Sequence, residues 1–331
     1  MTVLVTGGAG YIGSHTALAL LDTGRDVVIL DNLSQGHRWS VPVGAAFVEG
    51  DCGDYDLVMK IIHDHDVTAI LHFAGSIVVP ESVVYPLDYY YNNTVNSRAL
   101  AQAAVDSGIK HFIFSSTAGV YGEPEKTPIL EDFPSKPISP YGTSKMMTEK
   151  MLQDASVAHD LNYIALRYFN VAGADPQGRS GQTSRKATHL IKIASQAATG
   201  GRGHLEIYGE DYPTPDGTCV RDYIHVSDLA NAHLLALEYL EKGGESDVIN
   251  CGYGRGFSVR EVIDAVKRVS GIDFPVKLAE RRPGDPAALI AGADRIRAKL
   301  AWKPQYDDLD TIVRHALDWE ESLKTRQVDA A

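Results

Sequence analysis

Tyr141 and Lys145 are the residues of this chain whose types and spacing point most directly to chemistry. On a helix, residues four apart share a face, so the Lys145 ammonium can approach the Tyr141 phenol. A nearby cation lowers the pKa of a phenol from its usual value of about 10, and each unit of change needs about 1.4 kcal/mol. A phenol with a lowered pKa can act as a proton acceptor. The pair is a weak signal alone, so its meaning depends on the elements around it.

A glycine pattern near the start of the chain supplies that context. Gly7, Gly10 and Gly13 follow an apolar strand and open a helix, where backbone N–H groups and the helix dipole hold a pyrophosphate. Asp31 closes the second predicted strand about 20 residues further on, where a carboxylate accepts ribose hydroxyls and repels a 2′-phosphate. The pattern favours NAD over NADP, with NADP kept as an alternative because Arg38 is close in sequence.

Short apolar strands alternate with amphipathic segments up to about Arg167, which predicts a parallel sheet with crossover helices. The expected fold class is α/β, a doubly wound Rossmann sheet with a smaller C-terminal substrate lobe. The predicted strands are Thr2–Thr6, Asp26–Leu30, Phe47–Gly50, Ala69–Phe73, His111–Ser115 and Tyr163–Arg167. The predicted helices are Tyr11–Asp22, Tyr55–Asp64, Leu87–Ser107 and Tyr141–Ala158.

The pattern changes after Asn170. Gly173–Lys186 is rich in glycine and polar residues and is predicted to be an exposed loop. Asp247–Asn250 is strand-like and is expected to return to the sheet. We therefore expect an NAD-binding domain of residues 1–170 plus about 225–250, and a substrate lobe of about 171–224 and 251–331. The later predicted elements are His189–Ala198, Leu205–Tyr208, Ser227–Leu240, Val259–Val269, Asp294–Leu300 and Leu309–Leu323.

Polar residues follow several predicted strands at the carboxyl edge, where ligands of doubly wound sheets bind. Asp51 and Cys52 follow the third strand, Phe73–Gly75 the fourth, and Ser115–Thr117 the fifth, on the same edge as Tyr141. A site role for Ser115–Thr117 is favoured over a chance occurrence.

Other chemically suggestive residues have ordinary explanations. His72 is more typical of a core residue, and His63–Asp66 of a helix cap than of a metal site, so no metal is predicted. Arg221 and Arg282 are either diphosphate clamps or solvated surface residues, with equal weight.

Bulk composition limits the function classes. The chain has 331 residues and a formal net charge of −12, and it contains no run of Lys or Arg, which argues against nucleic-acid or anionic-membrane partners. No apolar run approaches the roughly 18 residues of a membrane span, and no signal-peptide pattern follows Met1. The three cysteines are odd in number and lack CxxC spacing, so a reducing, cytoplasmic location is expected.

With these residues placed, the chain resembles the extended short-chain dehydrogenase/reductase family, and within it the nucleotide-sugar epimerases, over nearly its whole length. The segments that carry the resemblance are Val3–His15, Leu30–Leu33, His72–Gly75, Phe112–Ser116, Ser139–Gly142, Leu166–Asn170 and Val220–Val226.

The resemblance implies three sets of site residues. The catalytic set is Tyr141, Lys145 and Thr117. The NAD set is Gly7, Gly10, Tyr11, Ile12, Gly13, Asp31, Asn32, Leu33, Ser34, Gln35, Gly36, Asp51, Cys52, Phe73, Ala74, Gly75, Ser76, Ile77, Asn93, Thr117, Tyr141, Lys145 and Phe169. The UDP-hexose set is Thr117, Tyr141, Asn170, His189, Leu190, Glu206, Tyr208, Arg221, Arg282, Asp285 and Leu289.

The implied activity is reversible C4 epimerisation of UDP-glucose and UDP-galactose through a 4-keto intermediate, with tightly bound NAD. Tyr141 would take the 4-hydroxyl proton, Lys145 would lower its pKa and hold the nicotinamide ribose, and Thr117 would shorten the proton path. A dehydratase would usually carry Asp-Glu after Thr117, where this chain has Ala118 and Gly119. The alternatives are another UDP-sugar (UDP-N-acetylhexosamine, UDP-glucuronate or UDP-pentose) and a catalytically idle NAD-binding redox sensor.

The chain departs from the family pattern at three positions. Ile77 replaces a lysine near the cofactor, His189 an amide at the substrate diphosphate, and Asn96 a glycine. Leu289 falls where the family's sugar pocket faces the C2 substituent, and its intermediate size implies weak turnover of N-acetyl sugars; an ordinary core role is equally weighted. The family also implies a homodimer through the predicted helices Leu87–Ser107 and Tyr141–Ala158.

Overall fold

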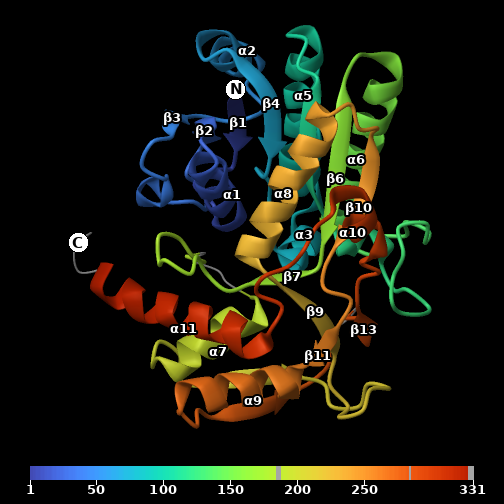
Figure 1. Cartoon of the computed structure of the whole chain (residues 1–331). Coiled ribbons are helices and arrows are strands. Elements are labelled where there is room, and N and C mark those ends of the chain that lie inside the picture. The colour runs from blue at the N-terminus through green and yellow to red at the C-terminus, as the bar shows by residue number, and fades with distance from the viewer. Residues whose placement is uncertain (184–187, 283–284, 327–331) are drawn as a thin grey trace.

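The computed structural model describes residues 1–183, 188–282 and 285–326, and its centre is a parallel seven-stranded sheet (Figure 1). The strand order is β10-β6-β5-β4-β1-β2-β3, so the order reverses beside β1, which confirms the predicted doubly wound fold. The strands are β1 (Thr2–Thr6), β2 (Asp26–Asp31), β3 (Ala46–Glu49), β4 (Val67–His72), β5 (His111–Thr117), β6 (Asn162–Tyr168) and β10 (Asp247–Cys251). As expected, β10 returns from late in the chain to pair with β6.

Both faces of the sheet are covered, because apolar side chains along its strands alternate between two cores. In β1, Val3 and Val5 face the core shared with α1 and α8, whereas Leu4 faces the core shared with α2, α5 and α6. The helices are α1 (Tyr11–Asp22), α2 (Tyr55–Asp64), α3 (Val79–Val84), α4 (Pro86–Tyr90), α5 (Asn96–Asp106), α6 (Pro140–Ala158) and α8 (Val226–Glu241).

Smaller sheets and the helices α7 (Leu190–Ala198), α9 (Val259–Ser270) and α11 (Leu309–Arg326) form the other end of the molecule, the lower part of Figure 1, whereas α10 (Asp294–Leu300) lies beside β10. The chain passes into this region at Phe169, between β6 and β7. One sheet contains β7 (Asn170–Ala172), β9 (Val220–His225), β11 (Gly256–Ser258) and β13 (Ala288–Leu289), and the other pairs β8 (Leu205–Tyr208) with β12 (Val276–Ala279). In the described part of the chain, no helix has the length and apolar character needed to cross a membrane.

The structure modifies two expectations about elements. The predicted helix Leu87–Ser107 is confirmed as a continuous helical segment, but a π-helical turn, Tyr91–Val95, which the sequence did not indicate, lies between α4 and α5. Gly173–Lys186 is not simply an exposed loop. Residues 184–186 lie outside the described residues, and the rest includes buried Asp175, Ser180 and Gln182. These polar side chains are buried because each one is paired, Asp175 with Arg179, Ser180 with Ser14 and Gln182 with His189.

A buried ion pair holds α6 against the central sheet. Arg167 of β6 donates to both carboxylate oxygens of Glu149, at 2.9 Å from Nε and 2.6 Å from Nη2, and the Ser116 hydroxyl also donates to Glu149. Both charged residues are only 6% exposed. Breaking such a pair leaves an uncompensated buried charge, which costs more than replacing both partners by apolar residues.

We therefore expect Arg167→Met to lower the free energy of unfolding by about 3–5 kcal/mol. The double variant Arg167→Met with Glu149→Leu should lose less, because no lone carboxylate remains buried. Urea unfolding of the purified variants measures both values. A double variant less stable than Arg167→Met would contradict this account of the pair.

Candidate active site

The turn after β1 packs against the end of β4, and this contact requires glycine. Gly7 has φ +70°, and a Cβ placed on it would lie 2.6 Å from the Ala74 backbone nitrogen. Gly10 is the N-cap of α1 and has no side chain to cap the first-turn N–H groups, and that turn begins with Tyr11 and Ile12. The N-terminus of α1 therefore has the chemistry of a pyrophosphate cradle.

Asp31 is held in place at the end of β2 by two backbone N–H groups. Ala9 N donates to Oδ2 at 2.9 Å and Leu33 N to Oδ1 at 2.8 Å, so each oxygen keeps capacity to accept a ribose hydroxyl. Burial raises the Asp31 pKa, and the two backbone donors oppose that rise. Leu33 adopts φ +56°, which is uncommon for a residue with a side chain and marks a specifically shaped loop at Leu33–Gly36.

Asp51 lies across this edge and is held by three donors. Its Oδ1 accepts from Gly53 N at 2.8 Å and from Asn96 Nδ2 at 3.0 Å, while its Oδ2 accepts from Asn32 Nδ2 at 3.1 Å. Asn96 thus occupies the space beside Gly53 and contributes a hydrogen bond. The neighbouring Cys52 is buried, and burial raises the pKa of its thiol to about 12, so it is a packing residue rather than a nucleophile.

Asn93 joins the π-helical turn to the segment after β4. Its Oδ1 accepts from Ser76 N at 2.7 Å, and its Nδ2 donates to Ser76 O at 2.9 Å. A Cβ placed on Gly75 would lie 3.4 Å from Lys145 Nζ and 3.0 Å from Asn93 Oδ1. The segment Phe73–Ile77 therefore contacts both Asn93 and Lys145. Ile77, at the end of this segment, is 48% exposed.

Tyr141 and Thr117 come together at the carboxyl end of β5. Ser139 caps α6 by accepting from Gly142 N at 3.2 Å, which places Tyr141 in the first turn of that helix. A Cβ placed on Gly119 would lie 3.3 Å from Thr117 Oγ1 and 3.8 Å from Tyr141 Cε1. The tyrosine and threonine predicted to share an edge therefore flank the same glycine.

In the chain alone, Lys145 is not among the groups that shift the Tyr141 pKa, and the lowering expected with bound NAD stays a prediction. Lys145 Nζ donates to Ser115 O at 3.0 Å and lies 5.0 Å from the centre of the Phe114 ring. Burial lowers the Lys145 pKa to about 8. Burial raises the pKa of Tyr141, with the Thr117 hydroxyl opposing the rise. Sharing a helix face is not enough, because the ammonium is directed to a strand carbonyl.

Several of the predicted sugar-nucleotide residues meet on β9 and β13. Arg221 Nη2 lies 3.4 Å from Asp285 Oδ1, and Asn170 Nδ2 donates to Asp222 O at 3.4 Å, beside Arg221. The Arg282 guanidinium stacks 3.7 Å from the centre of the Tyr208 ring, and the Tyr208 hydroxyl donates to Glu206 on the same strand, β8. Arg221 and Arg282 therefore each have a protein partner, and their role as diphosphate clamps stays a prediction.

Leu289 pairs with Arg221 in the β13–β9 ladder and is partly buried. It packs on a small apolar cluster that also contacts Phe169 and Met146. Leu289 is therefore not simply a core residue of the smaller lobe. The cluster on which it packs also contacts Phe169, a residue of the expected NAD set.

His189 and Leu190 lie at the start of α7, where His189 is the N-cap. The His189 Nδ1 atom is 2.8 Å from Nε2 of Gln182, a residue that the sequence patterns did not indicate, because an isolated glutamine in a loop has no diagnostic spacing. Burial lowers the His189 pKa, so its imidazole is neutral near pH 7. Across the described ranges, no cluster of three or more His, Cys, Asp or Glu residues is arranged to hold a metal ion.

Comparison with known proteins shows the family to which the chain belongs. A family model described as the NAD dependent epimerase/dehydratase family matches residues 3–252. The chain is 61% identical to the UDP-glucose 4-epimerase of Azospirillum brasilense over 97% of this chain and 92% of the relative.

Two solved structures are also similar over nearly the whole chain. One is UDP-glucose 4-epimerase from Brucella ovis in complex with NAD, with 46% identity, coverage of 96% and 97%, and a TM-score of 0.93. The other is the UDP-Glc/GlcNAc 4-epimerase from Campylobacter jejuni, with 50% identity, coverage of 97% and 99%, and a TM-score of 0.85. The resemblance seen in the sequence is confirmed, and the chain belongs to the NAD dependent epimerase/dehydratase family.

Proposed function

We propose that this chain catalyses the reversible epimerisation of UDP-glucose and UDP-galactose at C4, using tightly bound NAD. The observation that carries the proposal is the meeting of Tyr141 and Thr117 beside Gly119, on the sheet edge that also holds the glycine turn. The Azospirillum brasilense relative, a UDP-glucose 4-epimerase, supports the same activity.

The residues present fit NAD. The N-terminus of α1 would hold the pyrophosphate, the Asp31 carboxylate the adenosine ribose, and Asp51 the adenine amino group through its remaining acceptor capacity on Oδ2. Bound NAD would supply a reversible hydride acceptor for C4, which the passage through a 4-keto sugar requires. A carboxylate already fixed by two N–H groups favours NAD over NADP, because a 2′-phosphate would meet a buried negative charge.

Tyr141 is the proton acceptor for the 4-hydroxyl, and Thr117 supports it by hydrogen bonding. In the chain alone, burial raises the Tyr141 pKa, so the positive charge that makes its phenolate accessible must include that of the oxidised cofactor. Lys145, fixed on Ser115 O beside Gly75, is placed to bind the nicotinamide ribose and adds a second positive charge.

The residues divide between two regions. We assign the NAD-binding domain to residues 1–170 and about 225–250, and the UDP-sugar lobe to about 171–224 and 251–331, of which 184–187, 283–284 and 327–331 lie outside the described residues. The seven-stranded sheet supports the first assignment, because its strands β1 to β6 and β10 all come from these segments. Arg221 and Asp285, both within the second region, support its role in binding the UDP diphosphate and ribose.

A second candidate substrate is a UDP-N-acetylhexosamine. The Campylobacter jejuni neighbour is a UDP-Glc/GlcNAc 4-epimerase, and Leu289 here packs on the same apolar cluster as Phe169. Leucine is smaller than tyrosine at such a wall, and a partly open pocket discriminates by only about 1–3 kcal/mol. We assign weak N-acetyl activity beside the main activity.

We also assign the protein to the cytoplasm as a homodimer. An exposed apolar stripe runs along α4 and the π-helical turn. It consists of Leu87, Tyr91 and Val95, which follow one another at intervals of four residues and are 78%, 64% and 49% exposed. Met147, on the neighbouring α6, is also exposed. The cytoplasmic assignment is supported by the three cysteines, all free and buried.

Tyr141→Phe should lower kcat for UDP-galactose by about 10²–10⁴-fold, because it removes the proton acceptor while leaving the ring packing intact. NAD recovered from the denatured variant should equal that from wild type. Tyr55→Phe, which removes an exposed phenol hydroxyl on α2, is the control and should keep full activity. Turnover is measured without added reductant by separating the C4 epimers, and a near-normal rate for Tyr141→Phe would overturn the assignment.

Leu289→Tyr should abolish turnover of UDP-N-acetylglucosamine and leave UDP-glucose turnover within about threefold, because the added bulk meets only the C2 substituent. Both rates are measured on the same NAD-loaded preparations. Absence of N-acetyl turnover in wild type, or equal damage to both activities, would show that Leu289 does not face the sugar.

The double variant Leu87→Glu with Tyr91→Glu should be a monomer in sedimentation velocity, since two charges replace the centre of the apolar stripe. Val43→Glu, which changes a fully exposed valine elsewhere, is the control and should remain dimeric. A wild-type monomer, or an unchanged dimer in the double variant, would be evidence against this interface.

A further inference from the structure

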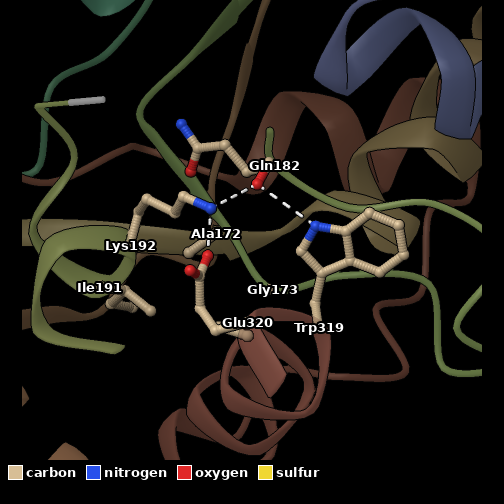
Figure 2. Close-up of a pocket in the computed structure, with 8 residues that line it drawn as sticks. Ala172, Gly173, Gln182, Ile191, Lys192, Trp319 and Glu320 are labelled. Carbon is tan, nitrogen blue, oxygen red and sulfur yellow. Dashed lines mark hydrogen bonds and ion pairs between the residues drawn. The ribbon is translucent and has the colours of Figure 1, made fainter. Parts of the chain in front are cut away.

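Gln182 is held by contacts at both its peptide group and its side chain. Its backbone oxygen accepts from Lys192 Nζ at 2.6 Å and from Trp319 Nε1 at 3.2 Å, as Figure 2 shows. Its side-chain Nε2 lies 2.8 Å from Nδ1 of His189. Gln182 is 5% exposed, so water does not compete for these hydrogen bonds.

The groups that hold Gln182 are themselves buried and fixed. Lys192 of α7 also forms an ion pair with Glu320 of α11, and both side chains are under 10% exposed. Trp319, the residue before Glu320, packs under Gly181, where a side chain would clash with the indole ring. Two neighbouring residues of α11 therefore hold the Gln182 backbone in place, directly through Trp319 and through Lys192 in the case of Glu320.

With the Gln182 amide nitrogen facing the ring, this contact indicates which nitrogen of His189 carries the proton. An amide nitrogen only donates hydrogen bonds, so His189 Nδ1 must accept, and the single proton of the neutral imidazole is on Nε2. The opposite tautomer would present a lone pair at Nε2, which repels an anion. His189 is also the N-cap of α7, so its ring lies at a helix end whose N–H groups and dipole favour negative charge.

We propose that Gln182 is a positioning residue that fixes His189 as the Nε2–H tautomer, so that the ring donates a hydrogen bond to the diphosphate of the UDP-sugar. This inference rests on the proposed function. The proposal gives a role to the buried Lys192–Glu320 pair and to the Trp319 indole N–H, because these groups hold the residue whose side chain contacts His189. Gln182 acts through His189 and does not touch the substrate.

The tautomer itself can be read without any variant. In NAD-loaded protein labelled with ¹⁵N-histidine, the His189 resonances, assigned by their loss in His189→Ala, should show a protonated Nε2 and an unprotonated Nδ1. A proton on Nδ1 would overturn the inference, because the amide would then be an acceptor. This measurement is independent of enzymatic activity.

Gln182→Met keeps the side-chain length and removes the amide donor. We expect the Kd for UDP, measured by calorimetry on NAD-loaded protein, to rise about fivefold. The KM for UDP-galactose should rise with it while kcat stays within about twofold, because no reacting group changes. Gln177→Met, an exposed glutamine of the same loop, is the matched control and should change neither constant.

A double-mutant cycle separates positioning from general packing. In a His189→Ala background, Gln182→Met should have no further effect on UDP affinity, because its target is gone. An equal loss in both backgrounds would show that Gln182 only stabilises the loop. If Gln182→Met does not fold, the wild-type tautomer and the UDP affinity of His189→Ala decide the question. A wild type that turns over no UDP-hexose would refute the proposed function, whereas a wrong tautomer in an active enzyme would refute only this inference.

Discussion

The close contact between the turn after β1 and the end of β4 is the constraint on which the site depends. Gly7 can approach the Ala74 backbone only because it has no Cβ and adopts φ +70°. This contact lies where the strand order reverses, so it brings the N-terminus of α1 next to the segment after β4. Asn93 then fixes Ser76, and the crossover helices cannot shift without losing hydrogen bonds.

Helix α6, which carries the proposed catalytic residues Tyr141 and Lys145, is held against the central sheet by two buried contacts. Lys145 is bound to a β5 carbonyl, and Glu149 one turn later is bound to Arg167 of β6, so α6 is attached to both strands. Tyr141 is thereby held at the sheet edge near Thr117. The arrangement orients the phenol but leaves its pKa raised in the chain alone, so orientation and ionisation have separate physical origins.

In the smaller region, buried polar contacts connect α11 to segments that are far away in the sequence. Helix α11 reaches the loop before α7 through Trp319 and Glu320, and the Trp319 ring lies 6.3 Å from that of Trp39, which follows the Leu33–Gly36 loop. One helix of the C-terminal part therefore contacts segments near the loops that we assign to cofactor binding and to substrate binding. Such contacts are typical of a site assembled from distant segments, because each loop alone lacks a core.

The sequence by itself determined the parallel sheet, the glycine turn, Asp31, Tyr141 and Thr117, because strand–helix alternation and strand-end positions are local patterns. It also indicated the family, through motifs whose order spans the chain. It could not show that Lys145 turns to Ser115 O, that a π-helical turn interrupts the helix carrying Asn93, or that Gln182 is buried against His189. Those features depend on groups far apart in the chain, whose distances and desolvation exist only once the tertiary structure has formed.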